Sequence, residues 1–441
     1  MKLKTLSTAI ILATLPMTGV LAAAMDRSGQ SISAFLQPGN YFEAGISVLD
    51  PNVSGKEAGT STTKRDVDNM ASDYYFPAAA LKVQVNDQFS VGLLYDQPFG
   101  AKAEYKGKNN FVSANTDTIL PAPGLPNTGQ LAGATGTTAP VGGTEVEVDT
   151  QNFSLLFGYQ PTKNWNFYAA PVYQTIKGDV KLRGQAYSVY NGYDATIKEN
   201  GAWGWLAGFA YQIPEIALKA SLTYRSEIDH KFTADENIGL ANTLNLALAG
   251  TPYAPLAAGL AAANRATGET KITTPQSVNL DFQTGIMEDT VAFANVRWVN
   301  WKDFAIQPYK FGLASKIVGG QAVPARPNGF NLVEYSKDQW NATVGVGRKF
   351  TDKWAGNFSV GWDSGAGDPV STLGPTKGYW NVGLGGQYSP AEDYFIQAGV
   401  KYFRLGDADA QTGAQAGSDY YVATFEQNHA WAYGLKIGYR F

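Results

Sequence analysis

The sequence predicts an all-β fold, a transmembrane antiparallel β-barrel of about fourteen strands with a short N-terminal plug inside the lumen. Three observations lead to this prediction. Apolar and polar residues alternate in many segments, short turns alternate with long connections, and the chain ends in an amphipathic strand. Successive side chains of a strand point to opposite faces, so each such segment presents one apolar face to lipid. After the N-terminal leader no stretch approaches about 18 consecutive apolar residues, so a spanning helix is not expected.

The last strand, residues 429–441, shows the alternation most clearly. Its apolar face consists of Trp431, Tyr433, Leu435, Ile437, Tyr439 and Phe441. Aromatic residues begin and end this face, as expected for rings at the two lipid–water interfaces. The stretch exceeds the roughly 9–11 residues that a tilted strand needs to span a bilayer. A terminal Phe on such a strand resembles the assembly signal of outer-membrane proteins, so we expect the outer membrane of a Gram-negative bacterium.

The N-terminal region predicts export. Residues 1–24 combine two lysines, an apolar stretch and Ala22-Ala23-Ala24, which is the pattern of a signal peptide cleaved after Ala24. Residues 25–39 are short, polar and rich in turn-forming residues. We expect them to form the plug, and a disordered start is the alternative. The chain has no Cys, so neither disulfides nor thiolate metal ligands are expected.

Residues 40–441 are predicted to form the barrel, with short periplasmic turns and long external loops. The loop 234–270 differs from the others because residues 237–266 are rich in Ala and Leu. This composition predicts two short helices broken at 250–255. Their leucines would form either an exposed apolar patch that contacts a hydrophobic partner or an interior packed on a neighbouring loop.

The third predicted strand is interrupted by Asp96-Gln97-Pro98-Phe99-Gly100. Proline cannot donate a ladder hydrogen bond and is confined to edges and bulges of sheets. A closed barrel has no free edge, so we expect a kink or bulge at this position. Pro98 either ends the strand or opens a deliberate gap in the wall.

Strand phase places five charged residues on the inner face of the barrel. They are Arg225, Arg297, Lys337, Asp363 and Lys401. Charges in a lumen commonly pair with one another and stiffen the wall. Alternatively, Arg and Lys in a partly dry lumen would bind a carboxylate head group.

Catalysis and nucleic-acid binding are not expected. The chain has only two His and lacks G-x-S-x-G and H-E-x-x-H motifs. Its net charge is −4, with no basic block, which argues against a nucleic-acid partner. We therefore predict no enzyme and no cofactor or metal.

Several motifs together resemble the FadL family, the outer-membrane long-chain fatty acid transporters. They are D-Q-P-F-G at 96–100, L-T-Y-R-S-E at 222–227, W-V-N-W-K-D-F at 298–304, Y-S-K-D-Q-W at 335–340, G-W-D-S at 361–364 and the final strand. Many members have a longer plug, or hatch, with an Asn-Pro-Ala stretch. Only residues 25–39 precede the first strand here, and Asn-Pro-Ala is absent. The resemblance therefore implies a minimal hatch, with loops sharing the plugging.

The resemblance also implies three binding regions. A greasy capture groove would lie between the loops 184–200 and 234–270, and its candidate residues are Leu240, Leu244 and Leu248. A tighter luminal site would lie near the hatch, and its candidates are Phe35, Arg225, Lys337 and Asp363. The ligand would leave sideways through a lateral gate at Pro98, Phe99 and Gly100.

The implied function is passive uptake of long-chain fatty acids or other hydrophobic small molecules. Outer-membrane lipid and lipopolysaccharide are the expected surroundings, and a monomer is expected. One alternative is a channel specific for aromatic or alkane hydrocarbons. Others are a porin for small polar solutes, which needs a water-filled lumen, and a structural or adhesive surface barrel.

Overall fold

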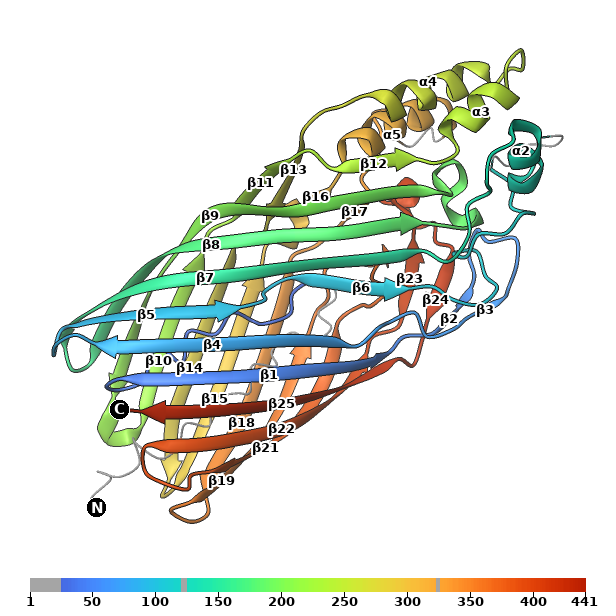
Figure 1. Ribbon diagram of the computed structural model, residues 1–441. Helices are drawn as coiled ribbons and strands as arrows, with labels where there is room; N and C mark the ends of the chain where they lie inside the picture. The colour runs from blue at the N-terminus through green and yellow to red at the C-terminus, as the bar shows by residue number, and fades with distance from the viewer. Residues whose placement is uncertain (1–24, 120–124, 323–325) are drawn as a thin grey trace.

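The computed structural model describes residues 25–119, 125–322 and 326–441, and a closed antiparallel barrel forms most of it (Figure 1). The expected signal peptide, residues 1–24, lies outside the described residues. Fourteen strands form the wall, with β1 paired to β25 and β9 paired to β10. In chain order they are β1 (Tyr41–Asn52), β4 (Tyr74–Gln84), β5 (Phe89–Asp96), β7 (Glu145–Thr162), β8 (Trp165–Leu182), β9 (Tyr193–Ile213), β10 (Leu218–Arg225), β14 (Ser277–Met287), β15 (Thr290–Val299), β18 (Gln339–Lys349), β19 (Trp354–Asp363), β21 (Tyr379–Tyr388), β22 (Tyr394–Leu405) and β25 (His429–Arg440). The predicted fold class and strand number are confirmed.

The outer surface of the barrel carries the apolar belt that the strand pattern predicts. One ring of aromatic residues lies toward the external loops, where Trp340, Trp362, Trp380 and Trp431 are exposed. A second ring lies toward the short turns and includes Phe89, Tyr159, Trp165, Trp354 and Phe441. Exposed Leu, Val and Ile side chains fill the band between them, as in a wall that faces lipid. No helix in the described part of the chain is long and apolar enough to cross a membrane.

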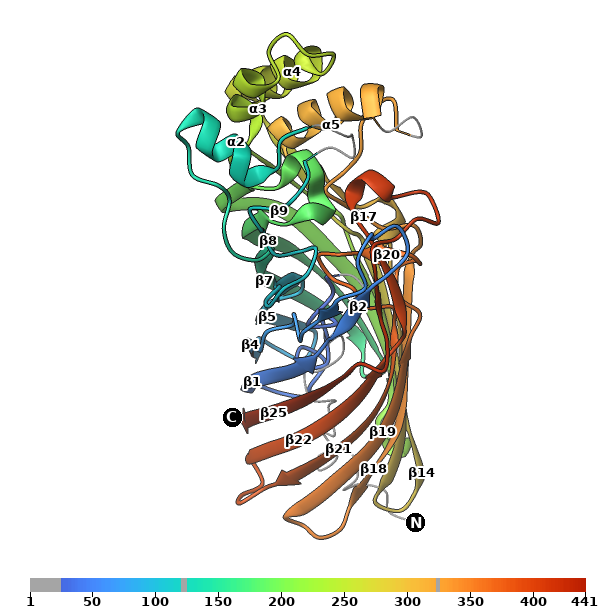
Figure 2. The same cartoon turned by 90° about the vertical axis from the view of Figure 1, so that its right-hand side faces the viewer.

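The long connections build a cap of small sheets and helices at one end of the barrel (Figures 1 and 2). A five-stranded sheet contains β2 (Gly55–Glu57), β3 (Asp66–Val67), β20 (Val370–Ser371), β23 (Ala408–Gln411) and β24 (Ala423–Phe425). β11 (Ile228–Phe232) pairs with β13 (Thr270–Thr274), β16 (Ala305–Ile306) pairs with β17 (Val333–Glu334), and β12 (Asp235–Ile238) extends the sheet at β9. The α-helices are α2 (Thr128–Thr135), α3 (Ala241–Ala247), α4 (Ala254–Arg265) and α5 (Tyr309–Ala322). Short 3-10 helices are η1 (Gln185–Tyr190), η2 (Pro214–Ile216), η3 (Trp301–Asp303) and η4 (Gly413–Gln415).

The Ala- and Leu-rich loop forms two short helices, α3 and α4, separated by a break at Gly250, as predicted. Leu240, Leu244 and Leu248 are only 2%, 3% and 3% exposed. They belong to the interior that α3 shares with its neighbouring helices, so for these three leucines the structure shows the second of the two alternatives, the packed interior. The loop helices pack against one another because this removes their apolar side chains from water.

The prediction of an external loop at 184–200 is also wrong in its extent. β8 ends at Leu182 and β9 begins at Tyr193, so residues 193–200 are part of the wall. β8 continues beyond the apolar belt together with its neighbours β7 and β9, and Glu145 of β7 forms a cross-strand ion pair of 2.7 Å with Lys181 of β8. Polar side chains on the outer face hid this extension, because the apolar alternation used to recognise strands stops at the belt.

The third wall strand is broken, as the proline at position 98 predicts. β5 ends at Asp96 and the chain resumes pairing as β6 (Gly100–Glu104), which pairs with β7. On the other side, β4 pairs with β5 only from Ala79 to Gln84. Residues 74–78 of β4 therefore extend past the ladder and face β6 across what we call the lateral gap.

The N-terminal segment, residues 25–39, lies against the inner face of the wall. Its backbone oxygens accept hydrogen bonds from inward-facing side chains: Asn279 to Gly29 (2.7 Å), Arg225 to Gln30 (2.6 Å) and Lys82 to Gln37 (2.6 Å). These contacts join the segment to β14, β10 and β4. They hold in place a segment that has no regular secondary structure of its own.

Candidate functional site

A cavity of about 370 Å³ lies at the external end, among loops that are distant in sequence. We call it the outer cavity. Four aromatic residues form part of its wall: Tyr187, Tyr190, Phe311 and Phe330. The rings of Tyr190 and Phe311 stack with centroids 4.4 Å apart, and Phe330 meets Tyr190 edge-on at 6.0 Å. Such clusters provide a rigid apolar surface for a ligand.

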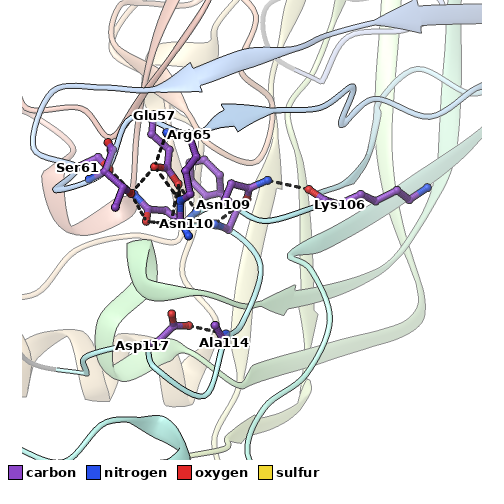
Figure 3. Close-up of polar contacts among 10 residues, drawn as sticks. Glu57, Ser61, Arg65, Lys106, Asn109, Asn110, Ala114 and Asp117 are labelled. Atoms are coloured by element: carbon purple, nitrogen blue, oxygen red, sulfur yellow. Dashed lines mark hydrogen bonds and ion pairs between the residues drawn. The ribbon is translucent and has the colours of Figure 1, made fainter.

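A polar network behind this wall fixes the position of Asn110, which lines the outer cavity (Figure 3). Arg65 donates to Glu57 through Nε at 2.9 Å and to the Asn110 side chain through Nη2 at 2.7 Å. The Asn110 backbone N–H donates to Glu57 at 2.6 Å. Burial alone raises the pKa of Glu57, but hydrogen bonds from Arg65, Thr63 and backbone amides outweigh it, so the pKa lies below its usual value. Glu57 is therefore ionised at neutral pH and balances the charge of Arg65.

Hydroxyl groups supply hydrogen bonds within the cavity wall. The Tyr187 hydroxyl donates to Thr372 Oγ1 at 3.1 Å, and the Tyr105 hydroxyl donates to the Thr372 carbonyl at 2.5 Å. Burial raises the pKa of Tyr187 to about 12, so the phenol stays neutral. η1 bends at Ser188, which has a φ of 51°, and the Ser188 hydroxyl donates to the Ile119 carbonyl.

A smaller apolar cavity of about 50 Å³, the inner cavity, lies deeper in the barrel. Met25, Ala101, Val148, Val180, Ile197 and Tyr335 are among its lining residues. Leu332 and Leu373 line both cavities, so their side chains lie at the boundary between the two. The two cavities therefore adjoin at these leucines, and the lining of the inner cavity extends to Met25 and to Ala101 of β6.

The N-terminal segment covers the inner side of the lateral gap. Arg27 N–H donates to the Pro98 carbonyl at 2.6 Å, and Gly100 N–H donates to the Met25 carbonyl at 2.8 Å. The Arg27 guanidinium lies 4.2 Å from the ring centroid of Tyr74 and 3.2 Å from an Asp149 oxygen. A Cβ at position 100 would come within 2.1 Å of this guanidinium, so glycine is required for the close approach.

The other gate candidate, Phe99, points inward. Its side chain is 3% exposed, and its ring meets Trp301 edge-on with centroids 5.5 Å apart. Trp301 belongs to η3, which follows β15, so this contact links the broken strand to the opposite side of the cap. All three gate candidates therefore lie at the lateral gap, in contact with the N-terminal segment or with the cap.

Phe35 is fully buried but serves as an anchor of the N-terminal segment. Its ring lies over Gly92 and Gly158, where an added Cβ would come within 2.6 and 2.8 Å of ring atoms. Tyr168 meets it edge-on, with centroids 6.0 Å apart. Phe35 does not line the outer or inner cavity among the residues that the structure describes.

Arg225 and Asp363 point inward as predicted and bind protein groups. Arg225 Nη2 donates to the Gln30 carbonyl. Asp363 accepts hydrogen bonds from Gln339 Nε2 at 2.6 Å and from Gly365 N–H at 2.8 Å. The luminal position predicted for Lys337 is wrong: it is exposed, in the bend between β17 and β18. β18 begins only at Gln339, so the strand phase did not extend to residue 337.

The residues that line the outer cavity were missed at the level of sequence. They come from loops around positions 60, 110–119, 182–190, 311–332, 372 and 412–422. No local pattern marks such a site, because each loop contributes only a few side chains. The loop 184–200, which the resemblance placed at the capture groove, is a partial match, because its residues 185–190 line the outer cavity.

A closed barrel with an apolar belt, an apolar external cavity and an internal N-terminal segment defines an outer-membrane transport barrel. The sequence model of one family, described as Outer membrane protein transport protein (OMPP1/FadL/TodX), matches residues 134–441. The chain belongs to this family and, with it, to the outer membrane.

Solved structures show the same fold at low sequence identity. A FadL homologue from Pseudomonas aeruginosa is 14% identical with a TM-score of 0.67, and the match covers 98% of this chain and 100% of that one. The toluene transporter TodX from P. putida is 13% identical with a TM-score of 0.56, over 96% and 94% of the two chains. The toluene transporter TbuX from Ralstonia pickettii is 11% identical with a TM-score of 0.54, over 97% and 99%.

One curated relative matches part of the sequence. Outer membrane protein IIIA of Rhizobium leguminosarum bv. viciae is 30% identical over 141 residues, which are 30% of this chain and 31% of that protein. The match therefore spans about a third of the relative's length.

Proposed function

We propose that this barrel mediates passive uptake of hydrophobic small molecules, such as fatty acids or hydrocarbons, across the outer membrane. The observation that carries the proposal is that the outer and inner cavities adjoin at Leu332 and Leu373, and that the lining of the inner cavity extends to Met25 beside the lateral gap. The described structures of similar fold include two toluene transporters.

Capture would occur in the outer cavity, where burial of apolar surface supplies the driving force, about 25 cal/mol per Å². This role replaces the groove expected around Leu240, Leu244 and Leu248, which are buried between helices. The wall of Tyr190, Phe311 and Phe330 would hold the ligand by ring contacts. Entry needs no energy source, because the ligand moves from water to a less polar surface.

Transfer inward requires the inner cavity to widen. Its volume of about 50 Å³ is below the roughly 150 Å³ of an apolar cavity that holds benzene. Met25 forms part of its lining, so movement of the N-terminal segment is the simplest way to enlarge it. The same movement would uncover the lateral gap, because Met25 and Arg27 hold Pro98 and Gly100 by backbone hydrogen bonds.

Release would then occur sideways, between β4 and β6, into the membrane. An apolar ligand gains nothing by entering the aqueous periplasm. Residues 74–78 of β4 lack a ladder partner on the side of β5, so opening there has to break the Tyr74 hydroxyl contacts with the Lys102 backbone and the Ala71–Ala103 bridge, but no continuous strand ladder. The lateral gate is Pro98, Phe99 and Gly100 together with the N-terminal segment that covers them.

The proposal is tested by measuring initial uptake rates of labelled toluene and labelled oleate in cells that lack their own transporter. Cells carrying this chain should exceed empty-vector cells for at least one compound. Heat-modifiable electrophoretic mobility confirms that the barrel is folded in the outer membrane. If neither compound enters above background, the proposal is wrong, and liposome swelling with sugars then tests a porin.

Lateral release can be tested with an engineered disulfide across the gap, because the chain has no Cys of its own that could interfere. Ala71 and Ala103 form an isolated antiparallel bridge across the mouth of the gap, and Cα atoms of such pairs are about 4.5–5.5 Å apart, within disulfide range. The variant Ala71→Cys/Ala103→Cys should lose uptake when oxidised and regain it when reduced. Val344→Cys/Val360→Cys, a directly paired position on β18 and β19, is the matched control. Equal uptake by oxidised and reduced gap variants would contradict lateral release.

A further inference from the structure

We infer that the outer cavity binds uncharged, mainly apolar molecules, so that this barrel selects neutral hydrocarbons and their uncharged derivatives over carboxylates. The inference rests on the proposed function and narrows its substrate class. It starts from the charge of the cavity wall.

Among the residues that the structure describes, those lining the outer cavity include no Lys, Arg, His, Asp or Glu. Its polar groups are hydroxyls and amides, such as those of Ser61, Asn110, Gln185 and Thr372. The undescribed internal ranges, 120–124 and 323–325, contain no ionisable residue in the sequence. Hydroxyls and amides suit a neutral ligand, whereas a buried carboxylate needs a cation or several converging donors.

Charged groups just outside the wall do not supply that cation. Arg65 is bound to Glu57 and to the Asn110 side chain (Figure 3), and Glu57 stays ionised. Arg183 and Arg326 are paired with Asp194 and Glu334 at 2.7 and 2.8 Å. Asp117, beside the lining residue Thr118, accepts a hydrogen bond from Ala114 N–H at 2.9 Å. Asp117 is acidic, so it adds no attraction for an anionic ligand.

Lys436 is paired with Glu43 at 3.2 Å, and four other cations inside the barrel contact the N-terminal segment. Arg297 binds Asp26, and Lys219 and Lys82 donate to the carbonyls of Leu36 and Gln37. Arg225 donates through Nη2 to Gln30, and although its Nε has no hydrogen-bond partner, Arg225 does not line the outer or the inner cavity as described. A carboxylate would have to displace the segment to reach any of these four.

The side chains described around the inner cavity are likewise uncharged. Cleavage of the leader after Ala24 would place one α-ammonium group at Met25. Of the two cavities, that residue lines the inner one. The α-ammonium charge would therefore act after capture and would not change the preference of the outer cavity for uncharged ligands.

The test compares two ligands with the same chain, labelled oleyl alcohol and labelled oleate, at pH 7.5. Initial uptake rates are measured in the cells described above, and the empty-vector rates are subtracted. We expect the alcohol to enter about tenfold faster than the acid, since the acid lacks a charge-assisted partner. Oleate uptake equal to or faster than alcohol uptake would overturn the inference while leaving the proposed function intact. Absence of uptake of both compounds and of toluene would instead overturn the proposed function and the inference with it.

A substitution that adds a positive charge to the wall of the outer cavity tests whether this cavity sets the preference for the alcohol over the acid. Gln185 lines the outer cavity and donates to Thr118 Oγ1 at 2.7 Å. Gln185→Lys should raise oleate uptake relative to alcohol uptake by about tenfold, the effect of one charge-assisted hydrogen bond. Leu246→Lys, which adds the same charge at a side chain that is 69% exposed and does not line the cavity, should leave the ratio unchanged. An unchanged ratio in a folded Gln185→Lys barrel would overturn the assignment of selection to the outer cavity.

Discussion

Asp26 and Arg297 form a two-point ion pair inside the barrel, with 2.7 Å between Arg297 Nε and Asp26 Oδ2 and 3.2 Å between Nη2 and Oδ1. Both side chains have an exposed fraction of 0%. Arg297 also donates to Asn279 at 2.6 Å and to Gln30 at 3.0 Å. The pair therefore joins the start of the N-terminal segment to β15 and β14, close to the lateral gap.

Asp26→Asn should loosen the N-terminal segment, because it leaves the buried Arg297 charge without compensation. Loss of one partner of a buried ion pair costs about 3–5 kcal/mol. Hydrogen exchange of residues 25–37 is expected to become faster, while exchange in the wall strands stays the same. The double variant Asp26→Asn/Arg297→Gln should exchange more slowly than the single variant. Unchanged exchange in Asp26→Asn would show that the pair does not hold the segment.

Phe35→Ala should release the other end of the segment. The substitution empties the space above Gly92 and Gly158, and such a change in a core costs about 3–5 kcal/mol. Faster exchange at residues 32–37 is the expected result. Phe350→Ala, at an exposed ring in a periplasmic turn, is the control and should have no effect there. If both variants behave alike, Phe35 is not an anchor.

Gly100→Ala should displace Arg27 from the lateral gap. The new Cβ would meet the guanidinium, which is the mobile end of its side chain and would move away from Asp149 and Tyr74. We expect faster exchange at residues 25–30 with the barrel still folded. Gly386→Ala, where a Cβ meets no atom within 4 Å, is the matched control. Retention of the wild-type exchange rate in Gly100→Ala would argue against this close contact.

Leu373→Trp should block transfer between the cavities, because Leu373 lines both of them. Ligand binding in the outer cavity should persist while uptake falls, at least about tenfold if no other route exists. Binding is measured with labelled toluene on purified protein, and uptake in cells. Leu246→Trp, at a side chain that is 69% exposed on α3, controls for the added bulk. Full uptake by Leu373→Trp would refute the connected route.

Uptake of neutral compounds should not change between pH 5.5 and 8, because neither Glu57 nor Tyr187, the two groups that fix the wall of the outer cavity, titrates there. The pKa of Glu57 lies below its usual 4.5, and that of Tyr187 is about 12. A depressed carboxyl pKa stabilises the fold above the unfolded-state pKa, and this contribution is lost as pH falls through the folded-state value. Loop opening and loss of uptake are therefore expected only below about pH 4.5. A transition near pH 6.5 would implicate a different group.

The barrel and the break in its third strand followed from local chemistry. Alternation in segments such as residues 429–441 reports which face meets lipid, and Pro98 removes a hydrogen-bond donor wherever it lies. Both effects act within a few residues, so they can be predicted from the sequence alone. The same local logic correctly placed the two helices of the loop 234–270 and the inward direction of Arg225 and Asp363.

The sequence by itself therefore determined the wall, its orientation toward lipid and the position of the lateral gap. Only the tertiary structure decided that Leu240, Leu244 and Leu248 are packed inside the cap, that Lys337 is exposed, and that a cavity with an uncharged lining lies among the loops. The physical reason is that a cavity is the space left between packed loops. Its shape and charge depend on contacts between residues as far apart as Thr60 and Gln415, whose side chains are hydrogen-bonded at 2.9 Å, and no periodicity along the chain encodes such contacts.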